Sequence, residues 1–230
     1  MRNEALQYNK NWQLKILEPD RLYMQERVLR TFHNLFLKIL KSDFGGKILD
    51  VGSGDGSFVK VCQKNKIPAV GIDISDGIDF ETDRLPFEDG YFDVAIMYSV
   101  LEHLHSPGNI LQEIYRVLKR EGKLIIITHN FELENLILCD RNFYDDPTHI
   151  RPYNRKSIKV LMKIYDFKVC FVGLWTVCKS HLIWKLPELA QFYYGALLPF
   201  YGTNRHVPNF LKGRSKGMLC VFEKYLGVKK

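Results

Sequence analysis

The sequence predicts a doubly wound α/β domain with a mostly parallel, seven-stranded sheet. Short apolar runs alternate with amphipathic helical stretches along the 230 residues, without an internal repeat or a Pro/Gly-rich linker. The runs are almost continuously apolar, for example YFDVAIMY, as expected of strands that helices cover on both faces. A glycine-rich turn, GSGDG, directly follows the first of these runs and leads into a helical stretch. These observations and the chain length indicate one domain.

The elements are predicted in chain order from their apolar spacing and from the residues that end them. A first helix covers residues 21–41, where apolar side chains recur at helical spacing before Gly45-Gly46. Asn109 is expected to cap a later helix, which Gly122 ends. The strands are predicted at 47–51, 69–74, 78–81, 91–98, 123–128, 167–175 and 218–225, and the other helices at 57–64, 109–120 and 154–165.

The composition excludes several classes of protein. Apolar residues make up 46% and charged residues 26% of the chain, which excludes a disordered or fibrous protein.

The five cysteines form no C-x-x-C pair, so neither a disulfide framework nor a structural zinc site is expected, and a reducing cytoplasm fits best. Residues 1–20 are polar and contain no secretory signal, and no apolar run is long enough for a membrane span. We therefore expect a cytoplasmic protein.

Charge is distributed unevenly along the chain. The net charge is +7, and residues 151–230 hold fifteen basic and three acidic side chains, a net charge of +12, which leaves −5 for residues 1–150. A basic C-terminal third suggests an anionic partner: a phosphorylated substrate, nucleic acid or an acidic membrane surface. A solvated basic face is the alternative.

The segment Asp50-Val-Gly52-Ser-Gly54-Asp-Gly56 carries the chemistry of the predicted ligand site. Alone it is a weak signal, compatible with a dinucleotide, a nucleoside or no ligand at all. Asp73 ends the second predicted strand, where a carboxylate can accept hydrogen bonds from a ribose diol. There is no Walker-type G-K-[ST], and the acidic Asp50 and Asp55 flank the glycines, which disfavours a pyrophosphate. A cationic nucleoside with a sulfonium and an ammonium group suits this charge.

Four segments in this order and spacing resemble the class I S-adenosylmethionine (SAM)-dependent methyltransferases, most closely their type 11 branch: KILDVGSGDGSF, VGIDIS, LPFEDGYFDVAIMYSVLEHL and KLIIITHN. The resemblance is strong over residues 45–130. It continues more weakly through 145–167, which is similar to the substrate-side segment of methyltransferases of O-antigen, capsule and other glycan biosynthesis. It implies a Rossmann-like methyltransferase fold with SAM as cofactor. The N-terminal helical segment would be 1–44, and 131–230 the substrate side with a helical insert at 180–216.

The resemblance also implies roles for individual residues. The methionine part of SAM would be lined by Asp50, Gly52, Ser53 and Gly54. The ribose would be held by Asp73, and the adenine would pack on Ile74. Three further residues would lie along the cofactor: Leu85, Tyr98 and Ser99. The family usually has a helix after the second strand, but here only Ser75-Asp-Gly77 precedes the next predicted strand, so the second crossover is truncated. This leaves the acid at the adenine amino group open: Glu81 is the first choice, with Asp79 and Asp83 as alternatives.

Motifs that the chain lacks exclude several classes of methyl acceptor. YSVLEHL stands where base N-methyltransferases carry [DN]-P-P-[YF], and no cysteine is present there for cytosine C5 chemistry. Metal-dependent relatives use E-x-x-E-H; here Ser99 replaces the first Glu and leaves only Glu102-His103, so no metal is expected.

An alcohol acceptor remains, and its methylation benefits from a general base. His149 is the first candidate for that base, with Asp146 to orient it, and His103 is the second. Packed histidines that bond only to backbone are the alternative. Arg151 and Arg155 would bind an acceptor phosphate or be solvated.

The working hypothesis is O-methylation of a sugar hydroxyl in surface-polysaccharide or related glycan biosynthesis, on a small-molecule, phosphorylated or lipid-linked substrate. The alternative functions are methylation of a quinone, a lipid or another small molecule, methylation of RNA, and binding of SAM without catalysis. A nucleic-acid partner is not expected, because no recognition module is evident. Residues 182–201, rich in Leu and aromatics, would form a lid, a core or dimer element, or a contact with the inner face of the membrane.

Overall fold

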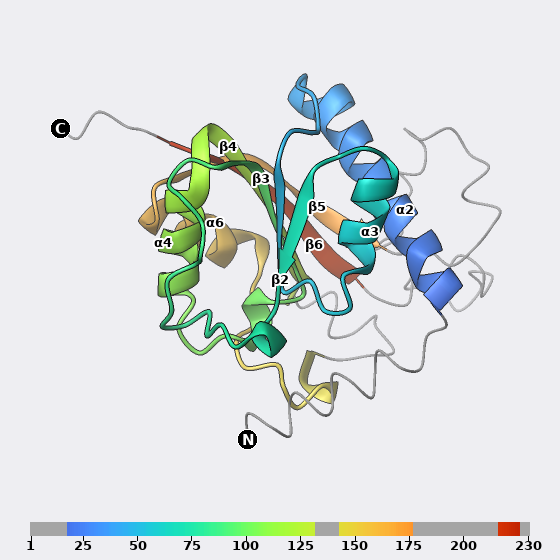
Figure 1. The fold of residues 1–230 in the computed structure, drawn as a ribbon. Helices are drawn as coiled ribbons and strands as arrows, with labels where there is room; N and C mark the ends of the chain where they lie inside the picture. The colour runs from blue at the N-terminus through green and yellow to red at the C-terminus, as the bar shows by residue number, and fades with distance from the viewer. Residues whose placement is uncertain (1–17, 132–142, 177–215, 226–230) are drawn as a thin grey trace.

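The computed structural model describes residues 18–131, 143–176 and 216–225, which build one six-stranded sheet (Figure 1). The strand order is β2-β1-β3-β4-β6-β5, with parallel pairing from β2 to β4 and β6 antiparallel to both of its neighbours. The predicted α/β fold with a mostly parallel sheet is confirmed, and the described residues form six of the seven predicted strands. The strands are β1 (Ile48–Val51), β2 (Ala69–Ile72), β3 (Phe92–Tyr98), β4 (Leu118–His129), β5 (Phe167–Thr176) and β6 (Lys216–Lys224).

The predicted strand at 78–81 is wrong, because this segment forms a turn. The N–H of Glu81 donates to Asp79 Oδ1 at 3.0 Å, and the N–H of Asp79 donates to Asp83 Oδ2 at 2.7 Å. Aspartate side chains that bind nearby backbone in this way favour a turn over an extended strand. The truncated second crossover is confirmed, since only the 3₁₀ turn η2 (Ile74–Asp76) follows β2 before this loop.

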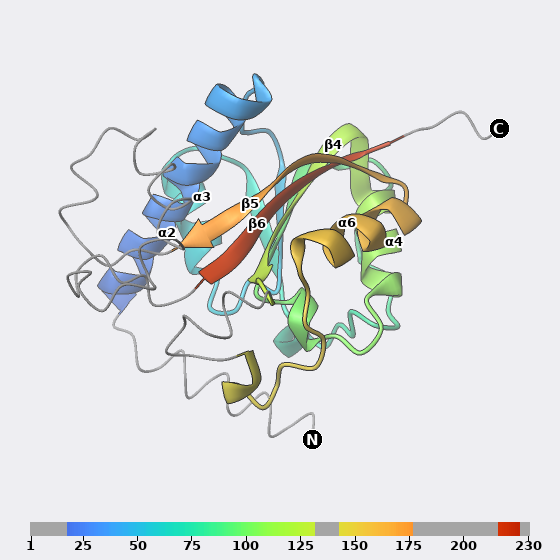
Figure 2. The same ribbon diagram turned by 180° about the vertical axis from the view of Figure 1, so that it is seen from behind.

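Helices cover both faces of the sheet (Figures 1 and 2). Alternate strand side chains point to opposite faces and build two cores: Ile48 packs in the core with Phe58 of α3, whereas Leu49 packs in the core with Ile110 of α4. The predicted helices are therefore confirmed as the covering layers. On one face lie α2 (Glu18–Asn34), its π-helical continuation η1 (Leu35–Leu40) and α3 (Ser57–Lys64), and on the other face lie α4 (Gly108–Val117) and α6 (Arg155–Ile164).

Asn109 does not cap α4 as predicted. The helix begins at Gly108 after Pro107, without a side-chain cap. The Asn109 Nδ2 group instead donates to the carbonyls of Phe80 at 3.2 Å and Asp83 at 2.9 Å. It therefore ties the loop after β2 to the start of α4.

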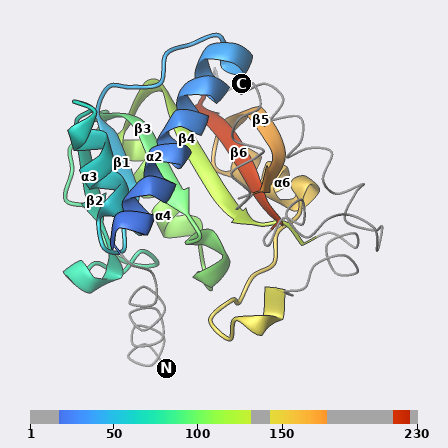
Figure 3. The same ribbon diagram turned by 90° about the vertical axis from the view of Figure 1, so that its right-hand side faces the viewer.

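The carboxyl ends of β1, β3 and β4 meet at one edge of the sheet, the lower edge in Figure 3. The short turns η3 (Leu101–His103) and η4 (Phe143–Asp145) lie at the same edge. Residues 180–215 of the predicted insert, including residues 182–201, lie outside the described residues, and Lys216 is the first residue of β6. Among the helices that are described, none has both the length and the apolar character to cross a bilayer.

Candidate active site

The turn after β1 is held in a conformation that needs glycine. Gly52, Gly54 and Gly56 have positive φ angles of 77°, 56° and 70°, a region that residues with a Cβ rarely adopt. The N–H groups of Gly52 and Ser53 both donate to the carbonyl of Ile72 in β2, at 2.8 and 3.1 Å. The turn thus presents bare backbone at the strand end, where a ligand can approach closely.

Asp73 follows β2 and joins the glycine turn to the neighbouring strand. Its Oδ2 accepts the N–H of Gly54 at 3.0 Å, and its Oδ1 accepts the N–H of Ser75 at 3.1 Å. A carboxylate has about four acceptor sites, so two remain for hydroxyl groups of a ligand. This arrangement suits the predicted role of Asp73 at a ribose.

Asp50 is a buried carboxylate in β1, only 4% exposed, and no described residue donates a hydrogen bond to it. Burial and the nearby Asp73 raise the pKa of Asp50 to about 7. A buried carboxyl without a partner is costly, and a cationic ligand would offset that cost. The residues present therefore fit the sulfonium nucleoside that the sequence predicts.

Three more predicted cofactor residues lie at neighbouring strand ends. Ile74 begins η2 and is half-buried, and Tyr98 is the last residue of β3. Ser99 follows with a φ of +52°, and its N–H donates to the carbonyl of Ile127 at 2.8 Å. A positive φ outside glycine is strained and concentrates at functional sites.

Glu81 and Leu85 were predicted to contact the cofactor. Leu85 is 1% exposed and packs in the core, with its N–H bound to Glu113 Oε2 at 2.8 Å, and its contact with the cofactor stays a prediction. Both carboxylate oxygens of Glu81 accept backbone N–H groups, from His105 at 2.9 Å and Ser106 at 3.0 Å. The contact of Glu81 with adenine stays a prediction.

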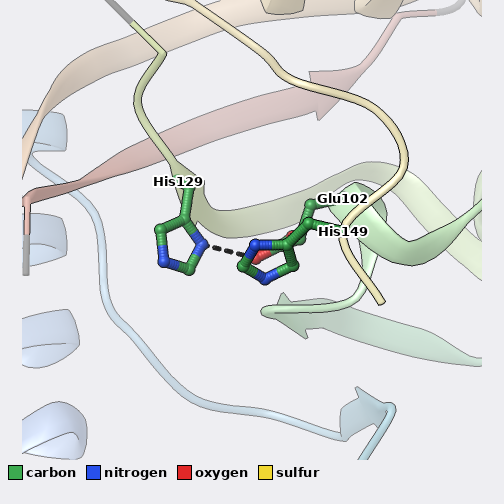
Figure 4. A group of neighbouring side chains, drawn as sticks. All are labelled: Glu102, His129 and His149. Carbon is green, nitrogen blue, oxygen red and sulfur yellow. Dashed lines mark hydrogen bonds and ion pairs between the residues drawn. The ribbon is translucent and has the colours of Figure 1, made fainter. Parts of the chain in front are cut away.

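A carboxylate and two imidazoles meet where β3 and β4 end. Glu102 lies in η3, His129 ends β4, and His149 follows η4. One potential ligand atom from each lies within 4.8 Å of the other two, and Figure 4 shows both rings beside the carboxylate. The carboxylate of Glu102 is fully buried and accepts from Thr128 Oγ1 at 2.8 Å and from His129 Nδ1 at 3.1 Å.

Glu102 is ionised in this setting. Burial opposes its charge, but the hydrogen bond from His129 and the charges of His103 and His129 outweigh burial and lower the pKa of Glu102. The Glu102 carbonyl also accepts the N–H groups of Ile150 at 2.9 Å and Arg151 at 3.1 Å. These bonds hold the loop that carries His149 against η3.

The ring of His149 is fixed in one orientation. Its Nδ1 donates to the carbonyl of Phe143 at 2.7 Å, and the two rings stack with centroids 4.7 Å apart and planes at 27°. In the neutral ring the lone pair is then on Nε2. Burial is the main cause that lowers the pKa of His149, so the neutral form prevails near pH 7. The predicted base therefore has a free proton-accepting atom.

His103 lies beside His149, with ring centroids 4.8 Å apart, and its Nδ1 donates to the carbonyl of Thr148 at 3.0 Å. Asp146 does not orient His149 as predicted: its Oδ1 accepts from the N–H and Oγ1 of Thr148, and its Oδ2 is 3.9 Å from His149 Nε2. The carbonyl of Phe143 orients the ring instead. We call Glu102, His103, His129 and His149 the histidine cluster.

Thr128, His129 and Phe143 belong to this site, although the sequence predicts no site role for them; Thr128 and His129 stand in the segment KLIIITHN. His129 could be found from its position directly after the apolar run KLIIIT, because residues that follow such a strand lie at the ligand-binding edge. Phe143 contributes a backbone carbonyl, which no side-chain pattern reveals.

Comparisons with known proteins agree with this geometry. Residues 21–170 match a family model described as a methyltransferase domain. An uncharacterised protein of Methanocaldococcus jannaschii is 28% identical over 156 residues, which cover 63% of this chain and 64% of that protein. The ubiquinone biosynthesis O-methyltransferase of Pseudomonas entomophila is 27% identical over 105 residues, 37% of this chain and 45% of that enzyme. The chain spans less than two thirds of the length of these relatives.

Among solved structures, a SAM-dependent methyltransferase from Archaeoglobus fulgidus superposes with a TM-score of 0.53 and 19% identity, covering 86% of this chain and 94% of that one. At this identity the likeness establishes the fold alone. The match to the family model includes the glycine turn, Asp73 and the whole histidine cluster.

Proposed function

The chain belongs to the methyltransferase domain family, with SAM as the methyl donor, and we propose that its acceptor is a hydroxyl group held against the histidine cluster. The observation that carries this proposal is the fixed ring of His149, whose Nε2 keeps a free lone pair at the edge where β3 and β4 end. A proton acceptor at this position suits a hydroxyl nucleophile, which must lose its proton on methylation.

The glycine turn and two carboxylates would hold the donor. When bound, SAM supplies a methyl group on a positively charged sulfur. Asp50 provides a buried negative charge for this cation, and Asp73 keeps acceptor sites for ribose hydroxyls. Because β1, β3 and β4 are parallel, this turn and the histidine cluster lie at the same edge of the sheet.

The histidine cluster would remove the acceptor proton. His103 and His149 each donate Nδ1–H to a backbone carbonyl, so Nε2 is the proton acceptor in both neutral rings. The acceptor oxygen bonds to the methyl carbon as the carbon–sulfur bond breaks, and the hydroxyl proton passes to an imidazole. A positioned base contributes about 10²–10⁴-fold in rate, and alignment for the in-line displacement contributes roughly 7–11 kcal/mol.

The acceptor that we propose first is a sugar hydroxyl of a glycan precursor. This proposal rests on the resemblance that the sequence suggests between residues 145–167 and glycan-biosynthesis methyltransferases, and the net charge of +12 on residues 151–230 suits a phosphorylated precursor. A phenolic hydroxyl of a quinone precursor is the second candidate, favoured by the similarity to the ubiquinone biosynthesis O-methyltransferase.

The test is methyl transfer from SAM to a panel of nucleotide sugars, sugar phosphates and catechol-type phenols, followed by release of S-adenosylhomocysteine. Turnover on a hydroxyl acceptor is expected, and the class that reacts separates the two candidates. Methylation of carbon or nitrogen acceptors alone, or no SAM binding by calorimetry, contradicts the proposal.

Variants test the base. We expect His149→Ala or His103→Ala to lower kcat by about 10²-fold or more while the Kd for SAM stays unchanged. His105→Ala is the matched control, because His105 is exposed and its hydrogen bonds to Glu81 and Arg151 use only its backbone N–H and carbonyl. If the first two variants retain wild-type kcat, the imidazoles are not the base.

A further inference from the structure

We propose that Glu102, His129 and His149 bind a divalent transition-metal ion. Their ligand atoms, one from each side chain, lie within 4.8 Å of one another (Figure 4). Imidazole nitrogen together with carboxylate oxygen suits Zn²⁺, Fe²⁺, Co²⁺ and Ni²⁺, and two histidines with one carboxylate leave coordination positions open. The sequence-based expectation of no metal came from the E-x-x-E-H pattern, which spans only residues 99–103. His129 and His149 lie outside that pattern.

Two of the ligand atoms already have the spacing of a metal site. His129 Nδ1 and Glu102 Oε1 are 3.1 Å apart. Ligands that bind one ion at 2.0–2.2 Å are separated by roughly 3–3.5 Å. The proton that this pair shares would be released when the ion binds. A shift of the His149 ring by roughly 1–2 Å would complete the three-ligand set.

The groups behind the ligands orient them toward a common centre. The carbonyl of Phe143 accepts from His149 Nδ1 at 2.7 Å, which leaves Nε2 as the ligand atom. Thr128 Oγ1 donates to Glu102 Oε2 at 2.8 Å, which leaves Oε1 toward His129. Such outer partners are characteristic of metal sites, where they fix the tautomer of a histidine and the direction of a carboxylate.

The charges of the site also match a divalent cation. Glu102 is fully buried, and Asp146 places Oδ2 3.9 Å from His149 Nε2. The two carboxylates carry two negative charges, and an imidazole that binds a metal ion does so in its neutral form and adds none. A divalent ion would balance both.

The role of the ion, though not its binding, rests on the proposed function. An ion at this position would bind the acceptor oxygen through an open coordination position and make its hydroxyl more acidic. His149 would then be a ligand, and the proton would pass to His103, whose Nε2 stays free.

The test uses the purified full chain, stripped with a chelator and titrated with Zn²⁺ and Co²⁺ by calorimetry and by the visible absorption of Co²⁺. We expect one ion per chain and a loss of affinity of about 100-fold or more in His129→Ala and His149→Ala, with His105→Ala as the matched control that binds normally. Mg²⁺, which prefers oxygen ligands, should bind far more weakly.

His149→Ala also removes the bond to Phe143, so His129→Gln provides a variant outside that loop. Weak, non-stoichiometric binding of Zn²⁺ and Co²⁺ to the wild type, or equal binding to His129→Gln and the wild type, overturns the inference. Calorimetry with SAM and the acceptor panel separate it from the proposed function. A chain that binds the ion but methylates no hydroxyl refutes only that function, whereas full hydroxyl methylation in chelator without ion binding refutes only the metal site.

Discussion

Replacement of Asp50 by Asn removes the buried carboxylate charge beside the glycine turn while keeping the side chain's shape. Burial and the charge of Asp73 raise the pKa of Asp50 to about 7. The carboxyl is therefore about nine-tenths ionised at pH 8 and about one-tenth ionised at pH 6. If only the ionised form pairs with the cationic donor, the contribution of Asp50 to SAM affinity is about ten times larger at pH 8 than at pH 6.

Calorimetric Kd values for SAM, measured for the wild type and for D50N at pH 6 and pH 8, check this magnitude. Free SAM has the same protonation state in both experiments at a given pH, so the ratio of the two Kd values reports only what differs between the two proteins. D50N should bind more weakly at pH 8, and the advantage of the wild type should shrink about tenfold at pH 6. An advantage that is constant or larger at pH 6 refutes the reasoning.

The same variant has a second readout in the ligand-free chain. The pKa of Asp50 is higher in the folded chain, about 7, than in the unfolded chain, where it is about 4. The chain therefore takes up a proton on folding between these values, and the free energy of unfolding falls by roughly 4 kcal/mol as the pH rises from about 4 to about 7. Urea unfolding should show D50N more stable than the wild type at pH 8, with a smaller difference at pH 5.

Three further predictions concern the turn, a loop tether and a thiol. A Cβ on Gly52 would clash with Val100 Cγ2, at a backbone φ of +77°. Gly52→Ala should therefore lower the melting temperature and weaken SAM binding at least about tenfold. Wild-type values for both quantities would contradict this prediction. Arg116 donates to two backbone carbonyls and to Glu113. Arg116→Met should therefore lower the free energy of unfolding, measured in urea, by about 2–4 kcal/mol. A decrease below about 0.5 kcal/mol would show that these bonds contribute little to stability. Burial and Asp50 raise the pKa of Cys62 to about 12, so a thiol reagent should label Cys62 only after unfolding, as mass spectrometry would show; rapid labelling of the native chain would refute its burial.

The sequence predicted most of the fold because the apolar spacing is local and strong. The helix predicted at 57–64 is α3 (Ser57–Lys64), and the strand predicted from 167 is β5. The segment 78–81 failed because IDFE alternates like a strand, whereas the side chains of Asp79 and Asp83 bind the backbone and curl it. Asn109 failed for a related reason, since loop carbonyls brought near by the fold compete for its amide.

The two halves of the site differ in how far sequence could predict them. The glycine turn and Asp73 are local features of a strand and the residue after it, so their motif gives both position and conformation. The histidine cluster is assembled by tertiary structure. His129 joins Glu102 only because β4 lies beside β3, and His149 depends on a carbonyl of Phe143.

The shortness of β2 has a dynamic consequence. This outermost strand of the described sheet has four residues, and the carbonyl of Ile72 at its end holds the N–H groups of Gly52 and Ser53. Fraying of the strand would release these bonds together with the one from Gly54 to Asp73. Part of the binding free energy of any ligand in the turn therefore goes into closing this local opening. Amide hydrogen exchange along β2 should slow in proportion to donor occupancy.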